Sequence, residues 1–251
     1  MRDLLVDVGN SRIKWAFSQA GKLSAHGSAV HHGVVPAESS QAWLAGEPPE
    51  RVIAANVAGE IYAQLFDEWV QRQWSLDVDY IEVDPDYSNV SLAYPDPSKF
   101  GVDRWLALIA ARGQTSVDVA VIDTGTAVTV DVMTAKGQHL GGIIMPGLSL
   151  MQQSLQQNTS AIQPGLNTRE KTKSTPFGQD TATGVAYGSL YAVTGAIEHL
   201  LAKGEAQTGG RLSVIISGGD AETVQAELRI ESQHVPGLVL QGMQILKGVC
   251  E

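Results

Sequence analysis

The sequence predicts a duplicated α/β fold of two related domains, and two observations lead to this prediction. An apolar, strand-like run ends at an Asp that is followed two residues later by Gly, once at Asp7 and again at Asp123. The two Asp residues lie nearly half a chain apart, and each begins a series of predicted strands followed by helices. A duplicated architecture explains this repetition more simply than a single sheet does. The predicted domains are residues 1–114 and 115–251.

In the first half, residues 4–17 predict a β-hairpin, because apolar residues alternate on both sides of a Gly-Asn turn. A helix is predicted at 60–73 and a second helix at 101–112, with Asp103 in the first turn of the latter. The buried face of the helix at 60–73 is expected to carry residues at helical spacing, namely Ile61, Leu65, Trp69 and Val70.

In the second half, a strand, a turn and a strand are predicted from residue 119 to 132, and another strand and turn at 141–147. Residues 158–180 are rich in Asn, Thr, Lys, Ser and Pro and predict an exposed, mobile loop. A long helix follows at 181–203. Its glycines permit close packing, either at a dimer interface or within one subunit.

The composition excludes several classes of protein. The chain has 251 residues, 43% hydrophobic and 18% charged, with a net charge of −10, which argues against broad nucleic-acid binding. No apolar run approaches the length needed to span a bilayer, and Asp7 interrupts the N-terminal run, so the cytoplasm is the expected location. Cys250 is the only cysteine, which excludes an internal disulfide.

The first turn has the groups needed to bind a metal-bound polyphosphate. Asp7 can hold Mg²⁺ directly or through water, Gly9, Asn10 and Ser11 can offer donors to phosphate, and Lys14 can reach the same phosphates. The alternative is an ordinary hairpin turn, for which Gly-Asn is a common choice.

The second turn repeats the acid, the glycine and the hydroxyls, which favours a second phosphate-contacting turn. In this second motif, Thr129 and Asp131 can alternatively be strand residues that face solvent. No G-x-x-x-x-G-K-[ST] motif occurs, so a P-loop NTPase is not indicated. Gly218 and Gly219 would let the backbone approach a flat ligand such as adenine, and a plain strand-to-helix turn explains them equally well.

A third group of residues opens the helix at 101–112. Asp103 could take a proton from an attacking hydroxyl, and Arg104 could bind an anionic substrate together with Tyr94 of the preceding Pro-rich loop. The alternative is a helix cap with a surface cation. The adjacent His31 and His32 show no metal-ligand spacing and are expected in a surface loop.

Four motifs follow one another along the chain. They are Asp7-x-Gly9-Asn10-Ser11-x-x-Lys14, Gly101-x-Asp103-Arg104-Trp105, Asp123-x-Gly125-Thr126-Ala127-x-Thr129 and Gly141-Gly142-x-Ile144-x-Pro146-Gly147. In this order and register they closely resemble the type III pantothenate kinases, and the resemblance covers most of the chain. Each motif alone is modestly specific, and the ordered combination is highly specific.

The resemblance implies an actin-like (ribonuclease H-like) α/β fold of two duplicated domains, with the nucleotide cleft between them, in a homodimer. It implies ATP-dependent phosphorylation of pantothenate to 4′-phosphopantothenate, the first step of coenzyme A biosynthesis, with Mg²⁺ as cofactor. A monovalent cation, K⁺ or NH₄⁺, is needed by some members and not by others. Neither nucleic acid nor a membrane is an expected partner.

The resemblance also implies roles for individual residues. ATP would be bound by Asp7, Val8, Gly9, Asn10, Ser11, Arg12, Ile13, Lys14 and Thr126. Pantothenate would be bound by Tyr94, Gly101, Val102, Asp103, Arg104 and, from the partner subunit, Thr181. Asp103 would be the general base, Asp123 the monovalent-cation ligand, and Asp7 the residue that holds Mg²⁺.

Two features depart from the family pattern. The loop at 158–180 does not align, and Lys99-Phe100 stands where a smaller aliphatic residue is more usual. Neither is expected to touch the chemistry. Two rival functions remain: a kinase of the same fold for another small hydroxylated acid, and a regulatory protein related to the accessory factors for virulence-gene expression.

Overall fold

The computed structural model describes residues 1–87, 89–159 and 175–248. The chain divides into two compact units, Met1–Ser116 with Gly237–Glu251 and Val117–Pro236. The expected division at residues 114 and 115 assigned everything after it to the second domain. The structure differs at the C-terminal end, because the last segment returns to the first unit.

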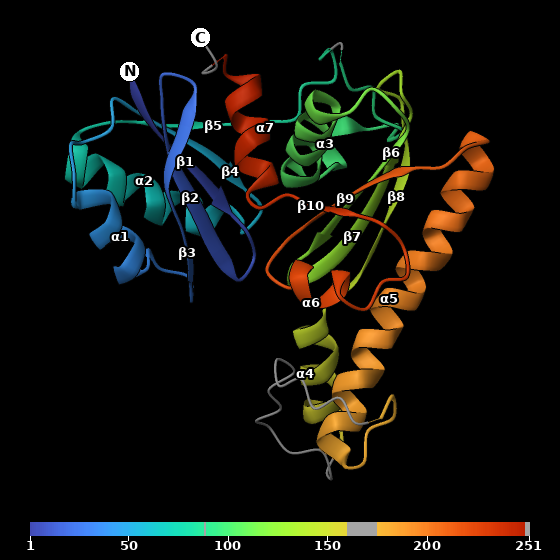
Figure 1. The fold of residues 1–251 in the computed structure, drawn as a ribbon. Coiled ribbons are helices and arrows are strands. Elements are labelled where there is room, and N and C mark those ends of the chain that lie inside the picture. Colours follow the sequence, from blue (N-terminus) through green and yellow to red (C-terminus); the bar gives the residue numbers. More distant parts are fainter. Residues whose placement is uncertain (88, 160–174, 249–251) are drawn as a thin grey trace. The chain divides into compact units, whose positions relative to one another are not determined.

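The sheet of unit 1 has five strands in the order β3-β2-β1-β4-β5 (Figure 1). The pairs β1–β2 and β2–β3 are antiparallel, whereas β1–β4 and β4–β5 are parallel. The predicted hairpin at 4–17 is confirmed as β1 and β2. The strands are β1 (Arg2–Val8), β2 (Arg12–Gln19), β3 (Lys22–Val30), β4 (Arg51–Asn56) and β5 (Val78–Tyr80).

The sheet of unit 2 repeats this topology strand for strand. Read from its other edge the order is β8-β7-β6-β9-β10, with β6–β7 and β7–β8 antiparallel and β6–β9 and β9–β10 parallel. The predicted duplication of an α/β unit is therefore confirmed. The strands are β6 (Val119–Thr124), β7 (Ala127–Met133), β8 (His139–Pro146), β9 (Ser213–Ser217) and β10 (Gln233–His234).

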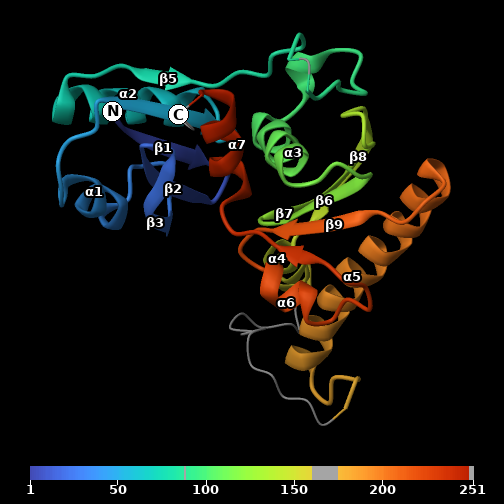
Figure 2. The ribbon, with the colours of Figure 1, turned by 45° about the horizontal axis from the view of Figure 1, so that its top comes forward.

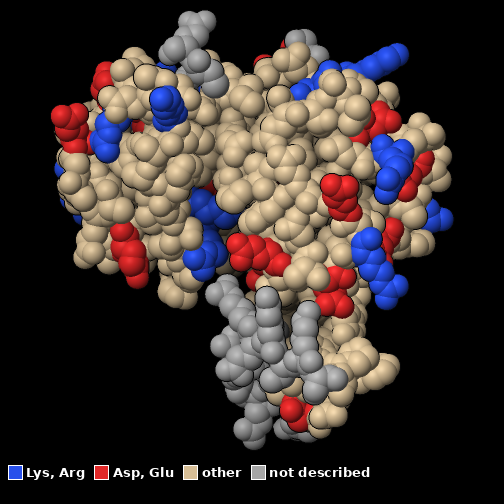
Figure 3. All heavy atoms as spheres, viewed as in Figure 1, with Lys and Arg blue, Asp and Glu red and all other residues tan. Residues whose placement is uncertain are grey.

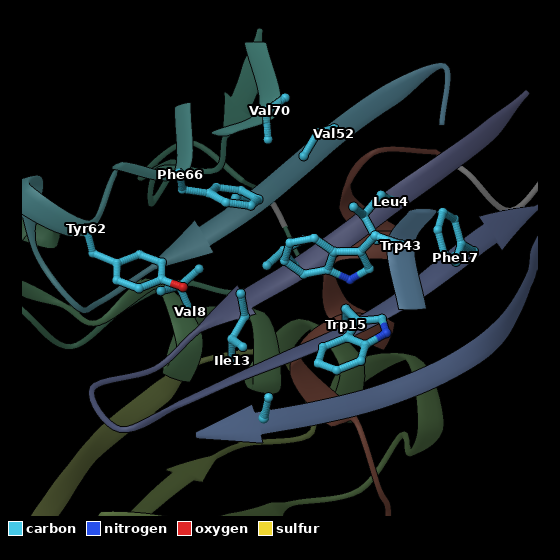
Figure 4. Packing of buried hydrophobic residues seen from close by; sticks show 13 residues of the cluster. Leu4, Val8, Ile13, Trp15, Phe17, Trp43, Val52, Tyr62, Phe66 and Val70 are labelled. Atoms are coloured by element: carbon cyan, nitrogen blue, oxygen red, sulfur yellow. The ribbon is translucent and has the colours of Figure 1, made fainter. Parts of the chain in front are cut away.

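One face of the unit 1 sheet is sealed by an aromatic cluster (Figure 4). The Trp43 ring contacts Trp15 and Phe66 edge-on, with centroids 5.7 and 5.8 Å away. The Trp69 ring is edge-on to both Trp43 and Trp74, with centroids 5.2 and 5.1 Å away. Such edge-to-face pairs add to the free energy gained from apolar burial. The helices of this unit are α1 (Ala37–Leu44), α2 (Glu60–Trp74), α3 (Val102–Gln114) and α7 (Leu238–Leu246), with a 3-10 turn at Pro97–Lys99.

The buried face predicted for α2 is wrong in part. Tyr62, Phe66 and Val70 are buried, whereas Ile61 is 78% and Leu65 is 38% exposed. Two apolar rows run along this helix one residue apart, and the row that carries the aromatic rings of Tyr62 and Phe66 fills the core. Both rows have the same helical spacing, so spacing alone does not show which one is buried.

The C-terminal helix α7 lies alongside α3 and also contacts β1 (Figures 1 and 2). Gly242 is needed for this packing, because a Cβ there would overlap the backbone of Leu106 in α3. Gln244 donates a hydrogen bond to Ser18 Oγ at 3.3 Å. These contacts explain why the last segment belongs to unit 1.

In unit 2, three helices pack on one face of the sheet: α4 (Leu148–Asn158), α5 (Thr181–Thr208) and α6 (Ala221–Gln225). The long helix predicted at 181–203 is α5 (Figure 2). The expected loop at 158–180 lies largely outside the described residues, since 160–174 are not described, and Cys250 also lies outside them. Among the helices of the described residues, none combines the length and apolar character needed to cross a bilayer.

Candidate active site

The first acidic turn joins β1 to β2 and holds an ion pair. Asp7 and Lys14 are cross-strand partners in the β1–β2 register, and Lys14 Nζ lies 3.8 Å from Asp7 Oδ2. Because side chains alternate along a strand, Asp7 faces away from the aromatic cluster, which is filled by Leu4, Val6 and Val8 of the same strand. The turn thus presents a carboxylate and an ammonium on one face of the sheet.

Among the predicted ATP-binding residues of this turn, Val8 and Ile13 have side chains in the core, so only their backbone can meet a ligand. Arg12 is exposed, and its Nη2 donates to Ser28 Oγ at 3.0 Å. A hollow of about 470 Å³ opens beside the turn and is lined in part by Arg12 and His31. Asn10 in the turn itself is exposed, so the turn can be reached from solvent.

The expectation that His31 and His32 lie in a surface loop is wrong for His31. His32 is exposed, whereas His31 is buried and its Nε2 donates to the carbonyl of Gly9 at 2.7 Å. The backbone N–H of His31 donates to the carbonyl of Ser11 at 3.1 Å. The histidine is thus attached to the turn at two points.

The second candidate element is the start of α3. Gly101 is the N-cap, and Asp103 lies in the first turn, where its Oδ1 accepts from the backbone N–H of Arg104 at 2.8 Å. A Cβ at Gly101 would stand 2.6 Å from that Oδ1. The glycine two residues before Asp103 therefore leaves the space that the carboxylate occupies.

Arg104 is buried among aromatic rings. Its Nη1 donates to Tyr94 OH at 3.3 Å, and its guanidinium lies 4.4 Å from the ring centroid of Phe100. The Tyr94 and Phe100 rings meet edge-on at 4.9 Å. Phe100, one of the two residues that depart from the family pattern, therefore packs against two of the predicted substrate-binding residues.

The second acidic turn, between β6 and β7, is packed by backbone. A Cβ at Gly218 would stand 2.5 Å from Thr124 N, and a Cβ at Gly147 would stand 2.7 Å from Thr126 O. Thr124 is fully buried and donates from Oγ1 to the carbonyl of Ser217 at 2.9 Å. Gly218 thus lies in a strand-to-helix turn that packs on Thr124.

Asp123 and Asp131, the two acidic residues of the second motif, lie in different surroundings. Asp123 is half-buried beside Gly125, whose Cβ would stand 3.0 Å from Asp123 Oδ1, so the glycine again leaves room for a carboxylate. Asp131 does not face solvent. It is buried, and its Oδ1 lies 3.0 Å from Nε2 of the buried His139, an ion pair when the imidazole is protonated.

Thr181 is exposed as the first residue of α5. The preceding Asp180 caps the helix, because its Oδ1 accepts from the backbone N–H of Thr183 at 2.8 Å and from the Thr183 hydroxyl at 3.1 Å. These hydrogen bonds, the backbone one first, lower the pKa of Asp180. The cap therefore fixes the backbone at the start of α5, where Thr181 is the first residue.

A divalent metal at this site would need oxygen atoms from a bound nucleotide as well as from the protein. Among the described residues, no three or more His, Cys, Asp or Glu side chains gather into a group that could hold a metal ion. Mg²⁺ commonly uses one or two carboxylates together with substrate phosphates and water, and Asp7 fits that donor set. On the face drawn in Figure 3, Lys and Arg stand in small groups among Asp and Glu.

The contacts of two residues do not follow from the sequence. The one sequence signal for Phe100 is its departure from the family pattern, and it contacts Tyr94 and Arg104. The one sequence signal for His31 is its position directly after β3, the strand that pairs with β2. Its backbone N–H continues that pairing by donating to the carbonyl of Ser11.

Comparison with known proteins agrees with these features. The family model described as type III pantothenate kinase matches residues 3–203. A type III pantothenate kinase from Nitrosococcus oceani is 35% identical over 247 residues, which cover 96% of this chain and 91% of that protein.

Two solved structures show the same fold. One is a candidate Baf family transcriptional activator from Campylobacter jejuni (22% identity, 98% of this chain and 97% of that chain covered, TM-score 0.59). The other is a candidate 2-dehydro-3-deoxygalactonokinase from Sinorhizobium meliloti (13% identity, 97% and 95% covered, TM-score 0.60). At these identities the likeness concerns the fold alone, and it agrees with the two-unit α/β architecture described above.

Proposed function

Because the chain belongs to the type III pantothenate kinase family, we propose that it transfers the γ-phosphoryl group of ATP to the primary hydroxyl of pantothenate. The product is 4′-phosphopantothenate, in the first step of coenzyme A biosynthesis. The observation that carries the proposal is the start of α3, where the Asp103 carboxylate, held by a backbone N–H, directly precedes the buried guanidinium of Arg104.

Asp103 is proposed as the general base. The hydroxyl oxygen of pantothenate attacks the γ-phosphorus, the bond from that phosphorus to the β–γ bridging oxygen breaks, and ADP leaves. Asp103 accepts the hydroxyl proton. Arg104, with Tyr94 OH as a hydrogen-bond partner at 3.3 Å, binds the carboxylate of pantothenate, because a guanidinium matches the geometry of a carboxylate. Gly101 and Val102 complete this part of the site through their backbone.

The first turn is proposed to bind the phosphates of ATP. Lys14 neutralises charge on the phosphates, and the turn from Gly9 to Ser11 offers donors. Mg²⁺ near Asp7 would offset the negative charge that the phosphoryl group carries during transfer. Most of the rate then comes from positioning and electrostatics rather than from covalent chemistry. Thr126 of unit 2 is also proposed to contact ATP.

A homodimer is proposed to form through α5. Gly184, Gly188 and Gly195 lie on this helix, and a Cβ at each would meet no described atom within 4 Å beyond its chain neighbours and the helix's own backbone. Gly178 packs on the backbone of Gly184 within the subunit, so the interface is supported by Gly188 and Gly195. The same helix begins at Thr181, which is proposed to reach pantothenate in the partner subunit, and Asp123 is proposed to bind K⁺ or NH₄⁺. The cytoplasmic location stays a prediction.

The test is ADP release by the purified protein with ATP and Mg²⁺, with and without pantothenate, in potassium and then in sodium buffer. We expect release that depends on pantothenate, and a loss of release in sodium would support the monovalent site at Asp123. Light scattering on the same sample measures the dimer. Folded, dimeric protein that releases no ADP with pantothenate would contradict the proposal, and a panel of other hydroxylated acids and a regulatory assay would follow.

Asp103→Asn tests the general base. The amide cannot accept the hydroxyl proton, so kcat is expected to fall by about 100-fold or more, with ATP affinity within about twofold of the wild type. Asp77→Asn is the matched control, because Asp77 is an exposed carboxylate with the same change in charge. Near-normal turnover in Asp103→Asn would refute the assignment.

A further inference from the structure

We propose that His31 is a positioning residue for ATP, because it orients the backbone donors of the first turn. The proposal rests on the function proposed above for that turn. His31 lies outside every motif that the sequence singled out as catalytic, and it is joined to the turn by its imidazole and by its backbone.

The hydrogen bonds of the imidazole fix its tautomer. The backbone N–H of Gly33 donates to His31 Nδ1 at 3.4 Å, so Nδ1 is the acceptor nitrogen. The neutral ring therefore carries its proton on Nε2 and donates it to the carbonyl of Gly9 at 2.7 Å. At that length the contact is among the shorter N–H···O hydrogen bonds.

The ring itself is held in place by Tyr62. The two ring centroids are 4.5 Å apart with a tilt of 55°, and His31 is 8% exposed. Burial raises the pKa of Tyr62 to about 12, so its phenol stays neutral beside the imidazole. A side chain that packs in this way loses little further freedom when it holds the turn.

The consequence for the turn follows from the planar trans peptide. No cis peptide bond is present among the described residues, so the N–H of Asn10 points opposite to the carbonyl of Gly9. Because His31 fixes the direction of that carbonyl, it also fixes the direction of the Asn10 N–H. Backbone N–H groups that are aligned before a phosphate arrives bind it without the entropy cost of ordering the loop.

Three substitutions separate this role from a structural one. His31→Phe keeps a ring against Tyr62 and removes the donor, whereas His31→Gln keeps an N–H donor without the ring. His32→Phe is the matched control, because it makes the same change at the adjacent, exposed histidine.

In steady-state assays, His31→Phe is expected to raise the KM for ATP about 5- to 10-fold, because one short hydrogen bond is lost. The KM for pantothenate and kcat should stay within about twofold of the wild type. His31→Gln should recover most of the loss, and His32→Phe should match the wild type. Equal rises in both KM values, or an unchanged KM for ATP in His31→Phe, would overturn the proposal.

Titration calorimetry with Mg·ADP distinguishes this inference from the function on which it depends. If the wild type binds no nucleotide, the phosphate turn itself is refuted. If the wild type binds Mg·ADP and His31→Phe binds it equally well, only the role of His31 is refuted. If His31→Phe does not fold, His31→Gln and His31→Asn are titrated instead. A wild-type affinity for Mg·ADP in His31→Asn, together with a weaker affinity in the longer His31→Gln, would contradict the idea that an amide donor replaces the imidazole.

Discussion

The turn after β1 and the turn after β6 occupy the same place in their sheets, and different atoms hold them. The carbonyl of Gly9 in the first turn accepts a hydrogen bond from the imidazole of His31. In the second turn, Gly147 and Gly218 bring main chain so close to Thr124 and Thr126 that a Cβ would not fit. The first turn thus depends on a side-chain hydrogen bond in addition to its backbone hydrogen bonds, whereas close backbone packing dominates at the second turn.

This difference has a chemical meaning. A hydrogen bond from one side chain can be removed or replaced by substitution without moving the main chain. Main chain packed against main chain has no such freedom, because any added carbon displaces a whole strand or turn. Substitutions in the first turn should therefore change ligand affinity, and those around the second turn should change stability and activity together.

The largest effect is expected from Gly218→Ala. The new Cβ would stand 2.5 Å from Thr124 N, and Gly218 has a φ of +106°, which L side chains rarely adopt. We expect a loss of about 2–4 kcal/mol in the free energy of unfolding, measured by urea titration. Gly219→Ala is the control, since nothing lies within 4 Å of its Cβ. If the two variants unfold at the same urea concentration, the second turn is not held by backbone packing.

An intermediate effect is expected from Phe100→Leu. This substitution tests whether the start of α3, like the first turn, depends on a contact made by one side chain. The guanidinium of Arg104 loses a ring that lies 4.4 Å away. A buried cation–π contact is worth about 1–2 kcal/mol, so the KM for pantothenate should rise about 5- to 30-fold with the KM for ATP unchanged. Lys99→Ala, at the exposed neighbour, should leave both constants as they are. A pantothenate KM equal to that of the wild type would show that Phe100 is only a packing residue.

The smallest effect is expected from Asp180→Ala, which removes the cap of α5. The pKa of Asp180 is lowered in the folded protein from its ordinary value of 3.8. A lowered pKa stabilises the fold above the unfolded-state pKa, and this contribution disappears as the pH falls through the folded-state pKa. Calorimetry at pH 7 should show a melting temperature about 1–2 °C below the wild type, with the gap closing below about pH 4. A gap that widens in acid would contradict the sign of this effect.

Local patterning predicted much of the fold. Alternation around the Gly-Asn turn predicted β1 and β2, and the repeated acidic turn predicted the second sheet. The buried face of α2 was predicted in part, because Ile61 and Tyr62 begin two apolar rows of equal spacing. Packing against the sheet and Trp43 decides which row is buried, and these contacts join residues that are not neighbours in sequence.

The candidate site likewise contains residues whose surroundings follow from a local motif and residues whose surroundings do not. Residues that follow one another in a motif, such as Gly101 and Asp103, lie together in the structure because the glycine makes room for the carboxylate. His31 and Asp131 could not be predicted in their actual surroundings. The burial of Asp131 depends on His139 in the next strand, and the role of His31 depends on a carbonyl that no sequence pattern records.

The return of α7 to unit 1 has a consequence for how the chain folds during synthesis. Val117–Pro236 is one continuous stretch, so its strands and helices are all available once Pro236 leaves the ribosome. The first unit, although translated earlier, lacks the helix that covers α3 and β1 until α7 emerges. The earlier half of the protein is therefore expected to mature last, with the apolar side of α3 exposed to chaperones in the meantime.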